Sequence, residues 1–62
     1  MTITFMSDTI RGHHIAIKQE KFSPSYHVID YDTRAQRTDS DRIYSTMQKA
    51  KTRYNALCRK YK

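Results

Sequence analysis

The chain has 62 residues, one cysteine and a formal net charge of +6 at pH 7, which allow one small domain and exclude an intrachain disulfide framework and a large core. Its first twelve residues lack the basic start and apolar centre of a signal peptide, and no run approaches the roughly 18 apolar residues of a membrane span. We therefore expect residues 1–62 to form a single, marginally stable cytoplasmic domain with no membrane role, completed by a second copy or another partner.

Alternating apolar and polar residues predict the first two strands. Residues 2–6 (TITFM) and 13–19 (HHIAIKQ) place β-branched or aromatic residues at every second position, which is typical of half-buried strands. Two candidate turns lie between them, one at residues 7–8 and one at Arg11 and Gly12, and the hairpin register stays open. Gly12 is the only glycine, so we expect a positive φ there if the chain needs one.

A third strand is predicted over residues 26–32 (YHVIDYD), after a turn at the Ser-Pro-Ser segment. Both faces of this strand carry apolar groups, so it is either central in the sheet or presents one face to a partner. Two inward faces remain open, namely Tyr26 with Val28 or Ile29 with Tyr31. The polar segment 33–41 predicts a loop.

The C-terminal segment predicts an α-helix, because apolar residues recur there at spacings of three and four: Met47, Ala50, Tyr54, Leu57 and Tyr61. Its start has two alternatives. Thr38 could cap a longer helix that includes Ile43, or Thr46 could cap a shorter one that follows a short strand over 42–44. We favour Thr46, because Ile43 and its tyrosine neighbour prefer strands.

These elements predict an α+β fold, in which an antiparallel sheet of three or four strands (residues 2–44) packs against one C-terminal helix (about residues 46–60). The apolar positions that point inward in this arrangement give the expected core: Ile3, Phe5, Ile15, Ile17, Val28, Met47, Ala50, Tyr54 and Leu57.

The positive charge is confined to the last third of the chain. Residues 1–41 hold five Lys or Arg against six Asp or Glu, whereas residues 42–62 hold seven Lys or Arg and no acidic residue. Solvated helices usually mix both signs, so this one-signed segment indicates an anionic partner, either DNA or RNA or an acidic protein surface.

Helical geometry places three of these cations, Lys49, Arg53 and Lys60, on one ridge beside the apolar stripe. Like charges at Lys49 and Arg53, four residues apart, cost a few tenths of a kcal/mol in an isolated helix, so a role outside the helix is expected for them. The remaining candidate contacts in the basic segment are Lys51, Arg59 and Arg42.

Catalytic and metal chemistry is not predicted. His13 and His14 are adjacent and point to opposite faces of a strand, and Cys58 has no second cysteine with which to build a zinc site. Asp30 and Asp32 share a strand face and are interpreted as solvent-facing, or as partners of nearby arginines. We expect a non-enzymatic protein without cofactors or metal.

The start of the predicted helix carries a family resemblance. The segment YSTMQKA resembles the F-x-T-K-x-E-A pattern that follows the last strand in AP2-like DNA-binding modules at the N-terminus of tyrosine-type integrases. It matches at Tyr44, Thr46 and Ala50, and departs from the pattern at Met47 and Lys49. The resemblance covers about residues 13–60.

The resemblance implies that the sheet, rather than the helix, contacts the DNA major groove. Carried over to this chain, it assigns contacts to Arg11, His14, Lys18 and Arg42, and leaves the helix as packing. It also implies that the protein belongs to a phage or another mobile element.

The leading hypothesis is therefore a small, basic, non-enzymatic nucleic-acid-binding protein. The alternative is a protein-protein interaction module, an inhibitor or adaptor that docks on an acidic protein surface or adds to the edge of a sheet. The apolar residues on both faces of strand 26–32 and the small core motivate this alternative.

Overall fold

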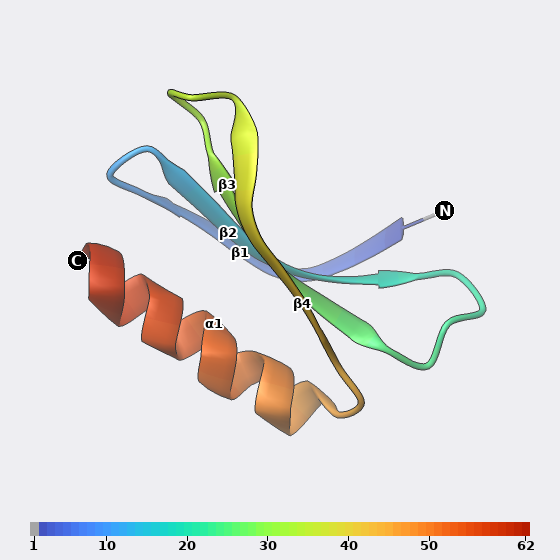
Figure 1. Cartoon of the computed structure of the whole chain (residues 1–62). Helices are drawn as coiled ribbons and strands as arrows, with labels where there is room; N and C mark the ends of the chain where they lie inside the picture. Colours follow the sequence, from blue (N-terminus) through green and yellow to red (C-terminus); the bar gives the residue numbers. More distant parts are fainter. Residues whose placement is uncertain (1) are drawn as a thin grey trace.

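Four strands and one helix make up the chain in a computed structural model that describes residues 2–62. The strands form one antiparallel sheet in the order β1-β2-β3-β4, and the helix α1 follows the last strand (Figure 1). The predicted α+β class is thus confirmed, with four strands. The bounds are β1 Thr2–Ile10, β2 His13–Glu20, β3 Tyr26–Asp32, β4 Arg37–Tyr44 and α1 Met47–Tyr61.

A two-residue turn joins β1 to β2. Arg11 and Gly12 have φ values of 50° and 83°, and turns with two positive φ angles match the twist of a hairpin. The expected positive φ at Gly12 is confirmed, whereas the alternative turn at residues 7–8 is wrong, because β1 continues through it to Ile10. A bulge between Thr4 and Met6 interrupts the β1–β2 register.

The predicted loop at residues 33–41 is half wrong, because β4 begins at Arg37. The turn itself is held by the Asp32 carboxylate, which accepts hydrogen bonds of 2.9 and 3.1 Å from the backbone N–H groups of Arg34 and Ala35. β4 is an edge strand with mostly exposed side chains. Its polar sequence therefore shows no apolar alternation, and its pairing with β3 defines it instead.

Thr46 caps the helix, as the favoured alternative predicted. Its side chain accepts a hydrogen bond of 3.3 Å from the backbone N–H of Lys49, and the longer helix starting at Thr38 is wrong because that residue lies within β4. Within residues 2–62, no helix is both long and apolar enough to cross a membrane.

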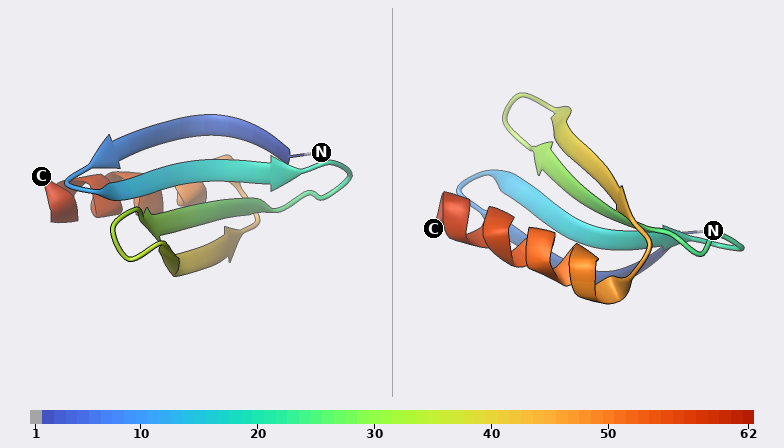
Figure 2. Two further views of the ribbon diagram at one scale, coloured as in Figure 1. Left: turned by 90° about the horizontal axis from the view of Figure 1, so that it is seen from above. Right: turned by 60° about the horizontal axis from the view of Figure 1, so that its bottom comes forward.

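The helix covers one face of the sheet and leaves the other open (Figure 2). It packs mainly against β2 and β3, with fewer contacts to β4. Val28 is buried on the covered face, which settles the orientation of β3, so Tyr26 and Val28 point inward while Ile29 and Tyr31 lie on the open face.

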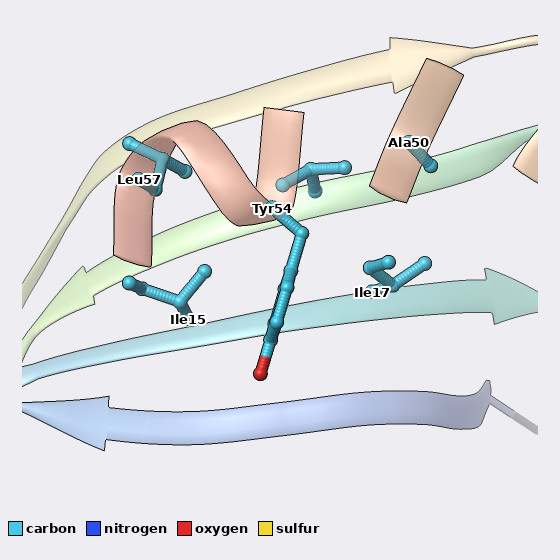
Figure 3. Packing of buried hydrophobic residues seen from close by; sticks show 6 residues of the cluster. Ile15, Ile17, Ala50, Tyr54 and Leu57 are labelled. Atoms are coloured by element: carbon cyan, nitrogen blue, oxygen red, sulfur yellow. The ribbon is translucent and has the colours of Figure 1, made fainter. Parts of the chain in front are cut away.

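The core lies between α1 and the two central strands (Figure 3). The Tyr54 ring reaches down between Ile15 and Ile17, with its hydroxyl directed toward β1. The buried cluster consists of six residues that were all predicted, namely Ile15, Ile17, Val28, Ala50, Tyr54 and Leu57, and Met47 packs against it partly buried.

Two predicted core residues are wrong. Ile3 and Phe5 are 49% and 43% exposed, because they lie on β1, the edge strand farthest from β4, beyond the area that the helix covers. Phe5 instead makes an edge-on contact with Tyr26, with ring centroids 5.8 Å apart.

Candidate nucleic-acid interface

A groove lies between α1 and the end of β4. It has a volume of about 340 Å³ and is lined by Tyr44 from the end of the strand and by four helix residues, namely Lys49, Thr52, Arg53 and Ala56. The helix contacts β4 less than it contacts the central strands. Helical spacing brings the four helix residues to the same side of α1.

Two cations dominate the charge of this groove, which we call the α1–β4 groove. Lys49 is exposed and Arg53 is half-buried, and no ion pair within residues 2–62 involves either of them. The buried Nε of Arg53 also has no hydrogen-bond acceptor in that part of the chain. The positive charge of the groove is therefore not neutralised by a protein carboxylate.

The helix macrodipole adds to the positive potential at Lys49. This residue lies in the first turn of α1, which contains no acidic side chain, and the N-terminus of a helix carries partial positive charge. The position is electrostatically unfavourable for a lysine in the absence of an anion. Arg59 and Lys60, by contrast, lie in the last turn, where the macrodipole favours them.

The other candidate residues of the basic segment lie around the α1–β4 groove rather than in it. Arg42 is opposite Val28 in the β3–β4 pairing and so lies on the helix side of β4, and Lys60 is two turns beyond Arg53 on the same side of α1. The Lys60 Nζ lies 5.3 Å from the centroid of the Tyr61 ring. Lys51 and Arg59 are exposed elsewhere on the helix.

The residues that the integrase resemblance suggested are not brought together. His14 and Lys18 lie on the open face of the sheet, Arg11 is in the β1–β2 turn, and Arg42 is on the helix side of the β4 edge. Lys18 lines a second hollow of about 290 Å³ together with two acidic residues, Glu20 and Asp41, and with Thr2, His27 and Ile29. Asp41 there lies 3.2 Å from the His27 ring. This mixed charge suits a polyanion less well than the α1–β4 groove does.

A buried polar network was missed in the sequence. Asp30 is only 1% exposed, which makes its interpretation as a solvent-facing residue wrong. One carboxylate oxygen accepts a 2.5 Å hydrogen bond from the hydroxyl of Tyr61, and the other lies 3.2 Å from Nδ1 of His13. The rings of His13 and Tyr61 stack with centroids 3.7 Å apart. The network ties the last turn of α1 to the centre of the sheet.

The network raises the pKa of Tyr61 to about 12, first because the hydroxyl donates to Asp30, and further because burial and the negative charges of Asp30 and Asp39 oppose the phenolate. The Arg53 guanidinium acts in the opposite sense. Two features of the sequence could have predicted this network. Asp30 is two residues from Val28 and therefore points to the same face of the strand, and Tyr61 lies on the apolar stripe of the helix.

Three potential metal ligands lie beside this network. Atoms of His13, Asp32 and Asp39, from three different strands, are within 4.8 Å of one another. The carboxylates are already engaged, because Asp32 closes the β3–β4 turn and Asp39 accepts a 3.2 Å hydrogen bond from Arg37. The turn bonds also lower the pKa of Asp32, the one from Ala35 most.

No protein-family model, curated protein or solved structure matches the chain.

Proposed function

We propose that the protein binds nucleic acid without catalysing a reaction, and that the α1–β4 groove is its contact surface. The observation that carries this proposal is the pair Lys49 and Arg53, which line one groove and have no acidic partner within residues 2–62. Such cations bind phosphate groups favourably, because their binding releases the counterions that are condensed on the nucleic acid. Lys60 and Arg42 would extend the contact on either side of the groove.

Salt dependence tests this function. Fluorescence anisotropy of labelled duplex DNA, single-stranded DNA and duplex RNA should show binding that weakens as salt rises. Three phosphate contacts, at Lys49, Arg53 and Lys60, should give a slope of about −3 for log K against log salt on duplex DNA. The absence of binding at low salt, or an affinity independent of salt, would refute the proposal.

Charge-reversed variants locate the contact. The double variant Lys49→Glu/Arg53→Glu should lose binding, whereas Arg11→Glu/Lys18→Glu, which lowers the net charge equally, should retain most of it. The opposite result would move the contact to the open face of the sheet, as the integrase resemblance implies. Thermal melts check that each variant folds. If the double variant does not fold because of Arg53→Glu, the single variant Lys49→Glu replaces it in the comparison.

A second candidate function is pairing with another protein along the edge strand β1. The observation in its favour is the exposure of Ile3 and Phe5 on this strand, which carries only Asp8 as a charged residue. Edge strands with exposed apolar residues and few charges are prone to association. If the partner is a second copy of the chain, sedimentation equilibrium should show a dimer that Ile3→Lys dissociates, and a monomeric wild-type protein would rule the dimer out.

A further inference from the structure

The α1–β4 groove combines apolar lining with charge. Tyr44 supplies an aromatic ring and Ala56 a methyl group, while the Thr52 hydroxyl is already used in a 3.0 Å hydrogen bond to the carbonyl oxygen of Gln48. The charged groups that line it are those of Lys49 and Arg53. Its volume of about 340 Å³ lies near the lower end of the range for small-ligand pockets.

Phosphate binding alone does not require this lining. A duplex keeps its bases stacked inside and presents phosphates, which cations on an exposed helix contact without an apolar groove beside them. An unpaired nucleotide offers both a negative phosphate and a flat base. Proteins that bind single strands use a basic groove with an aromatic side chain on which a base stacks.

We infer that the α1–β4 groove receives an unpaired nucleotide of a single-stranded nucleic acid, whose base stacks on Tyr44 and whose phosphates contact Lys49 and Arg53. This inference rests on the proposed function and specifies its ligand. Charge complementarity supports it, because the groove is lined by two cations and by no acidic residue.

The character of the lining favours a nucleotide over an acidic peptide. Arginine pairs with phosphate through several parallel donors and stacks on flat π-systems, and Arg53 makes no ion pair within residues 2–62 that would engage it elsewhere. Tyr44, which lines the same groove, offers a flat ring on which a base can stack. The carboxylates of an acidic peptide would use the charge of the groove but not the face of this ring.

Abasic oligonucleotides provide the matched probe, because they carry the phosphates of a single strand without its bases. Anisotropy titrations should compare oligothymidylate, an abasic strand of the same length and the corresponding duplex. The wild-type protein should bind oligothymidylate about five- to 150-fold more tightly than the abasic strand, the range given by one stacked base. Duplex affinity should resemble that of the abasic strand after allowance for its higher charge density.

Substitutions at Tyr44 complete the test. Tyr44→Leu keeps apolar bulk for the fold but lacks an aromatic face, so it should bind oligothymidylate as weakly as the abasic strand, whereas Tyr44→Phe should bind as the wild type does. Since Tyr44 also packs against the core, melting curves must show that both variants fold. The matched control is Tyr31→Leu on the open face, which should bind normally.

The outcomes separate this inference from the proposed function. Equal affinity for the base-containing and abasic strands, or an unchanged affinity of Tyr44→Leu, would overturn the unpaired-nucleotide site while leaving phosphate binding intact. Displacement of oligothymidylate by oligoglutamate of equal charge at equal concentration would also overturn it, in favour of an acidic protein. The absence of binding to any of the nucleic acids would refute the proposed function itself.

Discussion

The hydroxyl of Tyr61, in the last turn of α1, donates a 2.5 Å hydrogen bond to the carboxylate of Asp30 at the centre of the sheet. Asp30 is almost fully buried and opposes Ile15 and Ser40 on the neighbouring strands. A buried carboxylate without partners is costly, so this contact and the adjacent His13 ring are what make an aspartate tolerable in a core this small.

Removal of the Tyr61 hydroxyl should therefore destabilise the fold. Hydrogen bonds to charged groups contribute about 1.5–3 kcal/mol, and Tyr61→Phe should lower the free energy of unfolding by an amount in that range, measured by urea denaturation. Tyr31→Phe is the matched control, because within residues 2–62 the Tyr31 hydroxyl makes no side-chain hydrogen bond. Equal stability of the two variants would mean that the contact with Asp30 adds nothing.

The same hydrogen bond should make stability depend on alkaline pH. The pKa of Tyr61 is raised from 10.0 to about 12 in the folded chain, so the folded state holds the phenolic proton more tightly than the unfolded state does. This contribution is fully present below pH 10 and is lost as pH rises from 10 to about 12. The free energy of unfolding should fall more steeply across that window in the wild type than in Tyr61→Phe, and parallel curves would contradict the assignment.

Leu57 tests the packing of the helix on the sheet. It is 2% exposed within the core cluster, and Leu57→Ala should cost about 2–5 kcal/mol, comparable with the total stability of about 3–9 kcal/mol expected for a chain of this length. Ile43→Ala, at a residue 63% exposed, should change stability by less than about 0.5 kcal/mol. If Leu57→Ala melts at the same temperature as the wild type, Leu57 is not packed between α1 and the sheet.

Backbone conformation predicts a pair of opposite effects. Gly12 has a φ of 83° and Gln36 a φ of 55°, a region that costs residues with a Cβ about 1–2 kcal/mol. Gly12→Ala should therefore destabilise the hairpin by about 1 kcal/mol or more, and its added Cβ would also lie 3.1 Å from the Nε of Arg34. Gln36→Gly should be neutral or stabilising, and thermal melts that gave both changes the same sign would contradict these turns.

Most of the fold could be predicted from the sequence, because each of the two central strands and the helix has a residue pattern within its own segment. Alternation at 13–19 and the strand-forming run 26–32 after the Ser-Pro-Ser turn indicated the two central strands, and the spacing from Met47 to Tyr61 indicated the helix. The strand β4 was half missed because an edge strand with two polar faces shows no periodicity. Ile3 and Phe5 were assigned to the core because alternation along a strand predicts which residues share a face of the sheet. It does not predict which part of that face the helix covers.

The candidate site was only partly accessible from the sequence. The ridge of Lys49, Arg53 and Lys60 followed from helical geometry. The groove also requires Tyr44 at the end of β4, and its place beside the helix residues is a contact between two elements. The Asp30 network depends on a contact between residues that are 31 positions apart. Neither relationship has a local signature.

The central claim is that nucleic acid binds in the α1–β4 groove, and amide chemical-shift mapping of the ¹⁵N-labelled protein tests it most directly. Addition of single-stranded oligothymidylate at low salt should shift the amides of Tyr44, Lys49, Thr52, Arg53 and Ala56, and leave those of His14, Lys18 and Ile29 on the open face unchanged. Shifts confined to the open face would place the contact on the sheet and contradict the account.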